Sequence, residues 1–246
     1  MKTNLGKDFY LCDLQYEGLF CYQRKNGYGF TTDAVLLANF IQDCGNKRLV
    51  EFCSGSGVIS ILVNAKKKPK EIYCVEIQKE LADMNEKSLE FNKIKNIKVI
   101  CNSLENFASC VNDKFDVVLA NPPYYKVGAG RLPVSVEKRL SRFEVKTNIM
   151  SLVSSAKKVL NENGKLYLVF LTERENELNN VLSENGFKVI RKQYVRPKAT
   201  EGSHIFLVEA GLNYDGEEKL LPDIIVTNAD GSETEQIKEI YGRKPT

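Results

Sequence analysis

Residues 49–61 read Leu49-Val50-Glu51-Phe52-Cys53-Ser54-Gly55-Ser56-Gly57-Val58-Ile59-Ser60-Ile61, and this stretch decides the fold of the chain. Its apolar start predicts a buried strand, its glycine-containing middle predicts a turn, and a helix is expected to begin near Val58. Gly55 and Gly57 permit a positive φ and let the backbone approach a ligand closely. The helix would direct its first N–H groups at that ligand, so the pattern predicts a nucleotide-type crevice.

Two common phosphate-binding motifs do not match this turn. Cys53 stands where the first glycine of the dinucleotide-binding pattern would stand, so a nicotinamide cofactor is not expected. No Gly-Lys-Ser/Thr sequence follows the turn, as a P-loop would require. The turn therefore predicts a close approach to a ligand without identifying that ligand.

A second apolar run covers Glu71 to Glu76 and ends in a carboxylate. The carboxylate lies about 20 residues after the glycine turn, where doubly wound folds place an acid that binds ribose hydroxyls. A different interpretation is also open. Glu76 could be a solvated acid before a helix over 77–92, where the helix dipole would stabilise it.

A third segment, Asn121-Pro122-Pro123-Tyr124, directly follows the apolar run 115–120. The Asn121 side-chain oxygen and the Pro122 carbonyl could accept both hydrogens of a planar amino group, and Tyr124 could stack on the ring that carries it. That arrangement would release the nitrogen lone pair toward an electrophile. The alternative is an ordinary turn that ends a strand, since the prolines stiffen the backbone in either case.

The glycine turn, the acid at the strand end and Asn-Pro-Pro-Tyr, in that order, resemble the class I S-adenosylmethionine-dependent methyltransferases. The resemblance is to the branch that methylates exocyclic or amide nitrogens. The segment 28–38, Tyr-Gly-Phe-Thr-Thr-Asp-Ala-Val-Leu-Leu-Ala, is similar to the start of the tRNA1(Val) (adenine-37-N6)-methyltransferase family, as are residues 14–19 and the turn 23–27. This family modifies the base just 3′ of the anticodon of a valine tRNA, and the resemblance spans about Leu14 to about Glu209.

The resemblance implies S-adenosylmethionine as the cofactor, with no metal. It places Thr32, Asp33 and Glu51 around the methionine portion of the cofactor and Glu76 on its ribose. It also implies Asn121 and Pro122 as the groups that bind the amino nitrogen, with Tyr124 stacking on the base. The full set of implied cofactor residues is Thr32, Asp33, Glu51, Cys53, Gly55, Gly57, Glu76, Asn102, Ser103 and Asn121.

The chain departs from the family pattern in two places. The usual Asp-x-Gly-x-Gly-x-Gly becomes Glu51-x-Cys53-x-Gly55-x-Gly57, which keeps the charge of the acid and loses one glycine. After the strand expected over 97–101, Asn102-Ser103 stands where an aspartate commonly holds the cofactor adenine. Both side chains can still hydrogen-bond an amino group.

The resemblance implies a Rossmann-like α/β fold with a mostly parallel seven-stranded sheet and an antiparallel C-terminal hairpin. The pattern predicts an N-terminal hairpin near 19–30 and an organisation of 1–45 as hairpin and helix, 46–211 as the methyltransferase domain and 212–246 as a C-terminal extension. Strands are expected at 48–53, 71–76, 97–101, 115–120, 165–170, 187–195 and 204–210. Helices are expected at 32–42, 147–160, 175–184 and 233–241. The carboxyl ends of parallel strands would bring Glu51, Glu76, Asn102 and Asn121 to one edge.

Composition indicates a compact cytoplasmic enzyme. With 246 residues and 43% hydrophobic content, the chain is long enough for one α/β domain with small additions. No apolar stretch approaches a membrane span, and the polar start lacks the apolar core of a signal peptide. Seven cysteines without a Cys-x-x-Cys spacing favour reduced thiols over disulfides or zinc. The oligomeric state stays open, with a monomer favoured.

Basic residues concentrate next to Asn-Pro-Pro-Tyr, although the net charge is only +3. Between Lys126 and Lys146 the six basic residues exceed the two acidic ones, which favours contact with the phosphates of a tRNA anticodon loop. The candidates for RNA contact are Lys126, Arg131, Lys138, Arg139 and Arg142. A second group, Arg191, Lys192, Arg196 and Lys198, is expected on the same edge of the sheet, where phosphate binding is the favoured interpretation. The cluster at Lys66 is expected to be a solvated helix end.

The sequence therefore predicts transfer of a methyl group to the N6 of an adenine in tRNA. A glutamine-specific protein methyltransferase is the strongest alternative, because an amide nitrogen poses the same lone-pair problem and that family carries the same motif. Such enzymes usually have a helical domain first, and a first sheet strand near residue 48 leaves little room for one. A guanine-N2 rRNA methyltransferase and a catalytically silent RNA-binding relative also remain open.

Overall fold

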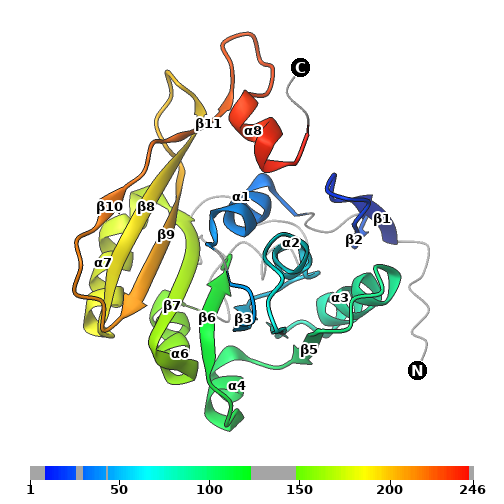
Figure 1. The fold of residues 1–246 in the computed structure, drawn as a ribbon, viewed down its shortest axis with the longest axis vertical. Helices are drawn as coiled ribbons and strands as arrows, with labels where there is room; N and C mark the ends of the chain where they lie inside the picture. The colour runs from blue at the N-terminus through cyan, green and yellow to red at the C-terminus, as the bar shows by residue number, and fades with distance from the viewer. Residues whose placement is uncertain (1–8, 26–29, 43, 123–147, 244–246) are drawn as a thin grey trace.

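The computed structural model describes residues 9–25, 30–42, 44–122 and 148–243, which form one mixed sheet with helices on both faces and a separate hairpin (Figure 1). The strands are β1 (Phe9–Asp13), β2 (Phe20–Arg24), β3 (Arg48–Phe52), β4 (Glu71–Glu76), β5 (Ile97–Cys101), β6 (Phe115–Ala120), β7 (Leu160–Leu171), β8 (Phe187–Lys198), β9 (Ile205–Leu212), β10 (Lys219–Leu220) and β11 (Ile224–Thr227). The helices are α1 (Thr32–Phe40), α2 (Val58–Lys67), α3 (Lys79–Phe91), α4 (Leu104–Cys110), α6 (Ile149–Val159), α7 (Glu175–Glu184) and α8 (Glu235–Ile240), with a 3-10 turn η1 at Thr172–Arg174.

The large sheet has the strand order β10-β8-β9-β7-β6-β3-β4-β5, and β11 also pairs with β8. Strands β5, β4, β3, β6 and β7 run parallel, while β9 is antiparallel to both β7 and β8. The predicted mostly parallel sheet with an antiparallel C-terminal hairpin is therefore confirmed. The seven expected strands correspond to β3 through β9. Two more, β10 and β11, add to β8, which at 12 residues is long enough to pair with both.

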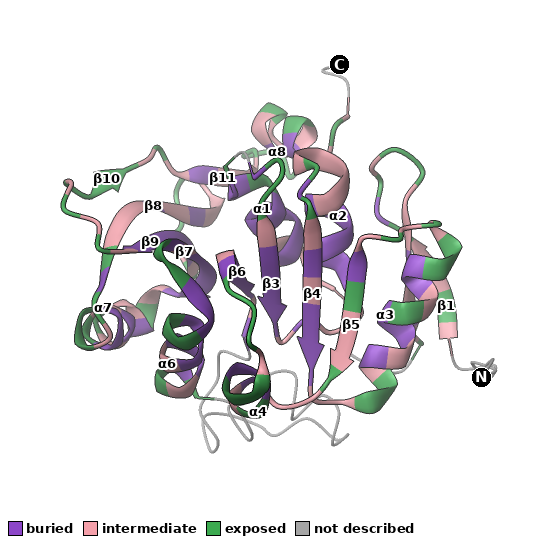
Figure 2. Ribbon diagram, turned by 60° about the horizontal axis from the view of Figure 1, so that its bottom comes forward, coloured by how far each residue is buried: buried purple, intermediate pink, exposed green. Residues whose placement is uncertain are grey.

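Helices cover both faces of the sheet, as a buried parallel sheet requires. Helices α1, α2 and α3 lie on one side, and α4, α6 and α7 lie on the other (Figures 1 and 2). Four of the five residues of β3 are buried, and Figure 2 shows β3 and β4 side by side with buried residues along most of their length. A strand buried on both faces reads as a continuous apolar run, which is why the sequence located β3, β4 and β6 well.

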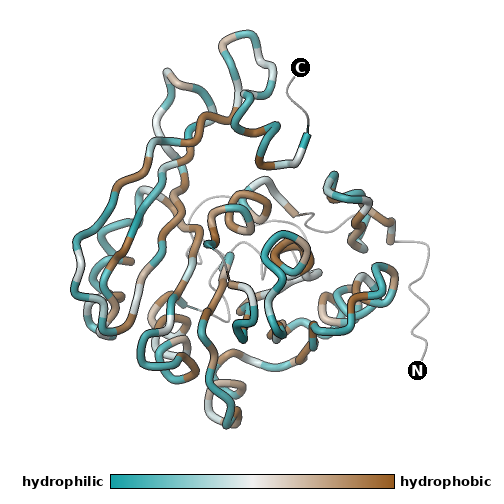
Figure 3. The backbone as a smooth tube through the Cα atoms, viewed as in Figure 1, coloured by the Kyte–Doolittle hydropathy of each residue, from teal (hydrophilic) through white to brown (hydrophobic). Residues whose placement is uncertain are grey.

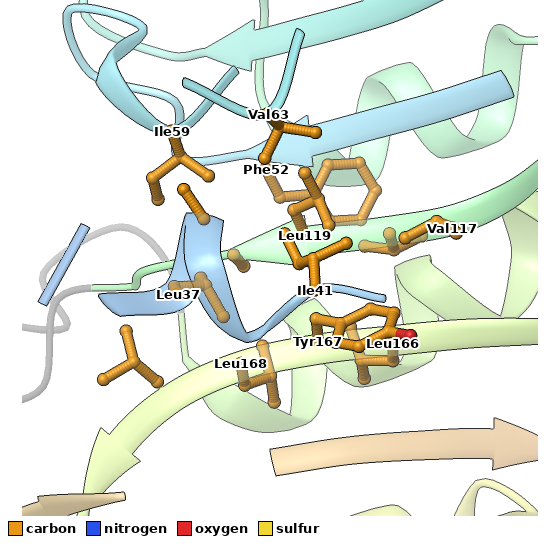
Figure 4. Packing of buried hydrophobic residues seen from close by; sticks show 14 of the residues in the cluster. Leu37, Ile41, Phe52, Ile59, Val63, Val117, Leu119, Leu166, Tyr167 and Leu168 are labelled. Carbon is orange, nitrogen blue, oxygen red and sulfur yellow. The ribbon is translucent and has the colours of Figure 1, made fainter. Parts of the chain in front are cut away.

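One hydrophobic cluster joins the sheet to the helices. Figure 3 shows the hydrophobic residues gathered on the central strands and on the inner faces of the helices. Figure 4 shows Leu37 of α1 and Ile41, the residue just after that helix, in the same cluster as Phe52 of β3 and Leu119 of β6. Each of these four side chains is at most 1% exposed, so α1 is part of the core and not an appendage.

The N-terminal hairpin differs from the prediction. Strand β2 lies where a strand was expected, but its partner is the upstream β1, with Phe9 opposite Arg24 and Asp13 opposite Phe20. The connection 14–19 has Gln15, Glu17 and Gly18 at positive φ, and the Leu14 N–H donates to the Leu19 carbonyl at 2.9 Å. The expected hairpin over 19–30 was wrong because β1 is short and none of its residues is buried, so it carries a weak sequence signal.

The C-terminal extension is built into the fold. Ile224, Ile237 and Ile240 are buried in the main cluster, and the short helix expected near 233–241 is present as α8. Lys66, expected to be solvated, donates to the Ile240 carbonyl at 2.7 Å and lies over the Tyr16 ring. Lys66 therefore links the end of α2 both to the extension and to the N-terminal segment.

The Glu209 carboxylate is fully buried in β9 and joins three strands. Lys165 of β7 donates to it at 2.5 Å, and Arg191 of β8 donates to the other oxygen. Burial by itself would raise the pKa of Glu209, but the hydrogen bonds from Lys165 and Arg191 hold that pKa below its ordinary value. Arg191 also donates to the Phe40 carbonyl, which fastens the end of α1 to the hairpin.

We expect Glu209→Ala to lower the free energy of unfolding by about 2–4 kcal/mol, because it leaves two cations without their shared carboxylate. The cost should lie somewhat below that of a fully buried pair, since Lys165 is partly exposed. Denaturant unfolding followed by circular dichroism measures the change. Glu233→Ala removes a partly exposed ion pair with Arg243 and serves as the control, with an expected loss below about 1 kcal/mol. Equal losses for both variants would show that burial of Glu209 adds nothing.

Candidate active site

The carboxyl ends of β3, β4, β5 and β6 meet at one edge of the sheet. Phe52 of β3 is paired with both Val75 and Ala120, while Glu76 is paired with Cys101. The residues that follow these ends in the chain include the glycine turn after β3, Asn102 after β5 and Asn121 after β6. The register therefore brings the predicted site segments to one rim, where open α/β sheets bind their ligands.

The glycine turn between β3 and α2 has an unusual backbone. Cys53, Gly55 and Gly57 have φ of 55°, 54° and 85°, all in the left-handed region. A Cβ at Gly57 would lie 2.2 Å from Oδ1 of Asn85, a side chain that is itself fully buried in α3. A Cβ at Gly55 would meet no described atom within 4 Å. Gly57 is thus required by packing, whereas Gly55 faces open space.

Cys53 occupies a backbone conformation that favours glycine. An L-residue in the left-handed region costs on the order of 1 kcal/mol. Cys53, which stands where the family pattern has a glycine, therefore adopts the left-handed conformation at some cost in strain. Its side chain is half-buried and packs against the main hydrophobic cluster.

Glu76 holds the glycine turn in place. Its two carboxylate oxygens accept from the backbone N–H groups of Gly55 and Gln78, each at 2.9 Å. The residue is 4% exposed, and burial raises the pKa of its carboxyl despite these hydrogen bonds. Each oxygen has a second lone pair, so the contacts leave capacity for a ribose hydroxyl. Glu76 is accordingly not the solvated helix start that was the alternative interpretation.

Glu51 lies beneath the turn in a polar network that the sequence did not reveal. One of its oxygens accepts from the Ser60 backbone N–H at 3.0 Å and from the Ser60 hydroxyl. The Cys74 thiol donates to the same hydroxyl at 3.1 Å. Burial, reinforced by the nearby Glu76, raises the pKa of Glu51 to about 8. Glu51 of β3 therefore binds the first turn of α2 through a carboxyl whose burial favours the protonated form.

The remaining cofactor candidates lie on neighbouring elements. Thr32 and Asp33 open α1, and burial raises the pKa of Asp33. Asn102 accepts from the Ser103 N–H at 2.9 Å, while the Ser103 hydroxyl caps α4 by accepting from Asn106 N at 3.2 Å. The Ser103 hydroxyl thus already has a structural function, and its predicted contact with a cofactor stays a prediction.

Asn121 and Pro122 follow β6 directly, with Asn121 half-buried and Pro122 buried. Pro123 and Tyr124 lie outside the described residues, as do all five RNA-contact candidates, Lys126, Arg131, Lys138, Arg139 and Arg142. The catalytic and RNA-binding assignments therefore stay predictions at these positions.

Three residues of the second basic group, Arg191, Lys192 and Arg196, form ion pairs within the protein. Arg191 binds Glu209, Lys192 binds both Glu175 and Glu218, and Arg196 binds Asp223. Paired cations attract phosphate much less than unpaired ones do, because the neighbouring carboxylates offset their charge. The sequence did not predict these ion pairs, since it does not show which acids the sheet brings beside the three residues, and contact of this group with RNA stays a prediction.

Sequence reasoning missed the residues that hold the site together. These residues are Ser60 of α2, Cys74 of β4 and Asn85 of α3, which pack around the glycine turn and Glu51. From the sequence alone, these elements were assigned only a structural role. One signal was present, because Ser60 is the single polar residue of the otherwise apolar run 58–63.

Three further observations concern only the part of the chain that the structure describes. It contains no group of three side chains suited to holding a metal ion. No helix within it is both long and apolar enough to cross a membrane. None of the seven cysteines, all of which are described, forms a disulfide, and Cys21, Cys44 and Cys74 are buried.

Comparison with known sequences finds a match to the methyltransferase small domain over residues 16–194. A tRNA1(Val) (adenine(37)-N6)-methyltransferase from Tolumonas auensis is 24% identical over 179 residues, or 72% of this chain and 73% of the relative. A release factor glutamine methyltransferase from Clostridium acetobutylicum is 26% identical over 185 residues, or 67% of this chain and 60% of the relative. Two relatives with different acceptors are thus similarly distant from this chain.

Solved structures share the fold at low sequence identity. A predicted O-methyltransferase from Agrobacterium tumefaciens has a TM-score of 0.68 at 17% identity, with 85% of this chain and 95% of that chain covered. The M. jannaschii protein TYW2, solved in complex with AdoMet, has a TM-score of 0.55 at 15% identity, with 85% and 88% covered. These similarities confirm the Rossmann-like α/β fold.

The buried Glu51 leads to a pH-dependent prediction. Its pKa of about 8 in the folded protein exceeds the ordinary 4.5, so the folded state holds a proton that the unfolded chain releases between these values. Stability from the protonated acid is therefore present at low pH and is lost as the pH rises through about 8. We expect Glu51→Gln, which mimics the protonated form, to gain stability relative to the parent as the pH rises from about 5 to about 9.

Urea unfolding of both proteins across this pH range measures the effect. The control is Glu86→Gln, which removes an exposed carboxylate on α3 and should follow the parent at every pH. A constant difference between Glu51→Gln and the parent would mean that Glu51 is ionised throughout the range.

Proposed function

The chain belongs to the methyltransferase small domain family, and on that premise we propose that it transfers a methyl group from S-adenosylmethionine to the N6 of an adenine in tRNA. The base just 3′ of the anticodon of a valine tRNA is the proposed position. The observation that carries the proposal is the position of Asn121-Pro122 directly after β6. Strand β6 is paired with β3, and the glycine turn follows β3. Such a substrate would place the reaction in the cytoplasm.

The glycine turn fits S-adenosylmethionine. The Ser54 hydroxyl is buried and has no hydrogen-bond partner among the described residues, so it can serve a bound ligand. The open space beside Gly55 lets a ligand approach the backbone. Glu76 would accept from ribose hydroxyls, and Asn102 would lie beside the adenine. Glu51, Thr32 and Asp33 would surround the methionine portion, with Cys53 and Gly57 shaping the turn and Ser103 next to the adenine edge.

The cofactor would supply an electrophilic methyl group, so the protein contributes positioning and lone-pair release. Asn121, through its side-chain oxygen, and Pro122, through its carbonyl, would accept the two hydrogens of the amino group. Accepting both hydrogens favours a tetrahedral nitrogen, whose lone pair then points at the methyl carbon. Tyr124 would hold the plane of the base by stacking. No residue need act as a strong base, because the amine can lose its proton after transfer.

An anticodon loop suits this site better than a duplex does. A base in such a loop is already unpaired, so extruding it costs less than flipping a paired base. The cationic segment that follows the motif would bind the loop phosphates through Lys126, Arg131, Lys138, Arg139 and Arg142. Residues 46–211 would form the catalytic unit, with 1–45 packed on it and 212–246 as its extension.

A protein glutamine acceptor is the second candidate, because the Clostridium acetobutylicum relative is named for that activity. The amide nitrogen of glutamine would use Asn121 and Pro122 in the same way. Two features favour tRNA. The segment that leads into α1 carries Phe30-Thr31-Thr32-Asp33, the part that resembles the tRNA enzymes, and the cationic segment offers phosphate contacts that a glutamine acceptor would not require.

Single-turnover methylation separates the two acceptors. We expect purified protein with radiolabelled S-adenosylmethionine to label unmodified valine tRNA at adenine N6, and not to label a release factor that carries a glutamine acceptor. Nucleoside mass spectrometry identifies the methylated atom. Labelling of protein glutamine alone would overturn the tRNA proposal, and failure to label either substrate despite cofactor binding would favour a silent RNA-binding relative.

We expect Asn121→Ala to reduce the rate of methyl transfer by on the order of 10²–10³, the typical effect of removing one preorganised polar group. Cofactor affinity should change little, because Glu76 holds the glycine turn through the Gly55 N–H and is left unchanged by this substitution. Single-turnover assays measure the rate of methyl transfer, and calorimetry measures the affinity for the cofactor. Asn228→Ala changes an asparagine in an exposed turn of the extension and should leave both values at the parent level.

A further inference from the structure

Gln23 of β2 is a buried side chain whose amide joins two separate segments. It is 2% exposed. Its Nε2 donates to the Ser56 hydroxyl at 2.6 Å, and its Oε1 accepts from the Phe30 backbone N–H at 3.2 Å. A buried amide that satisfies partners on both of its ends fixes the distance between them, because breaking either contact leaves a polar group unpaired.

The two segments joined by Gln23 are the two walls of the candidate cofactor site. Ser56 lies within the glycine turn, between Gly55 and Gly57. Phe30 precedes Thr31, the N-cap of α1, and so leads directly into Thr32 and Asp33. The sheet positions the glycine turn, and the hydrophobic core positions α1. The Gln23 side chain contacts both the turn and the segment that leads into α1.

A second contact from the same strand reinforces the first. The Cys21 thiol, fully buried, donates to the Ser56 carbonyl at 3.2 Å. Ser56 is therefore held by β2 through both its hydroxyl and its backbone. The N-terminal hairpin consequently acts on the central residue of the turn and does not merely cover it.

The hairpin is positioned by contacts that do not involve the turn. Asn92, at the end of α3, accepts from the Phe20 N–H at 3.0 Å and donates to the Phe20 carbonyl at 2.6 Å. The Ser88 hydroxyl of α3 accepts from the Tyr22 N–H at 2.9 Å. These hydrogen bonds hold β2 against α3, and so they fix the position from which the Gln23 side chain reaches the glycine turn.

We propose that Gln23 is a positioning residue for the cofactor: through Ser56 and Phe30 it sets the glycine turn and the entrance of α1 relative to each other. This inference rests on the proposed use of S-adenosylmethionine. It makes the N-terminal hairpin part of the cofactor site, although none of its own side chains need touch the cofactor. Loss of the bridge should therefore weaken cofactor binding more than it weakens the fold.

The test uses the full chain and compares Gln23→Met with Asn92→Ala. Methionine keeps most of the volume of glutamine but can form neither hydrogen bond, whereas Asn92→Ala removes two hydrogen bonds of the same hairpin away from the turn. We expect Gln23→Met to weaken binding of S-adenosylmethionine by about tenfold or more in calorimetry, the effect of losing two ordinary hydrogen bonds. Asn92→Ala should weaken it less than about threefold, at a similar loss of melting temperature.

Kinetics and a mutant cycle provide readouts that a purely structural role would not change. For Gln23→Met, KM for the cofactor should rise while kcat at saturating cofactor and KM for RNA stay near the parent values. Ser56→Ala should reproduce part of the loss, and Gln23→Met should cost less affinity when Ser56 is already alanine.

The outcomes distinguish this inference from the proposed function. A parent protein that binds S-adenosylmethionine, together with a Gln23→Met variant that binds equally well, would overturn the positioning role alone. Equal weakening by Gln23→Met and Asn92→Ala would also overturn it, because the effect would then follow hairpin stability. A parent that does not bind S-adenosylmethionine would overturn the proposed function and this inference with it. Methylation of protein instead of tRNA would leave the role of Gln23 standing.

Discussion

The hydrogen bond from the Gly55 N–H to the buried Glu76 carboxylate is the contact on which the site depends. It ties the turn that follows β3 to the end of β4, two segments that meet only because the strands are paired in parallel. The same carboxylate accepts from Gln78 and so also fixes the start of the next helix. Because the residue is almost fully buried, each of these bonds would leave a costly unpaired group if it broke.

A second acid sits below the first and has a different physical state. Glu51 binds the Ser60 N–H at the start of α2, but its burial favours the neutral form, so it supports the turn mainly as a hydrogen-bonding group. Two carboxylates under one turn would repel each other if both were fully ionised in this low-dielectric region. A neutral Glu51 relieves that repulsion. Glu51 thus keeps the acid of the family pattern at this position, in buried surroundings that favour its neutral form.

The described part of the site is assembled from three layers of contacts that reach one edge of the sheet. The strand register brings the turn beside Asn121 and the end of β4 beside the end of β5. The helices supply the packing, with Asn85 filling the space that a side chain at Gly57 would need. The N-terminal hairpin then contacts the turn from outside through Gln23. A site built this way depends on segments more than 60 residues apart in the chain, such as Gln23 and Asn85.

The sequence by itself determined the parallel sheet, the glycine turn and the positions of Glu76 and Asn121, because apolar runs buried on both faces and strand-ending motifs are local signals. Only the tertiary structure decided the pairing of β1 with β2, the addition of β10 and β11 to β8, and the burial of α8. These elements are short, and their stability comes from partners distant in the chain. The same reason explains the ion pairs of Arg191 and Lys192, whose acidic partners come from other elements that the fold brings beside them. Side-chain partners depend on which strands become neighbours, and no local pattern encodes that choice.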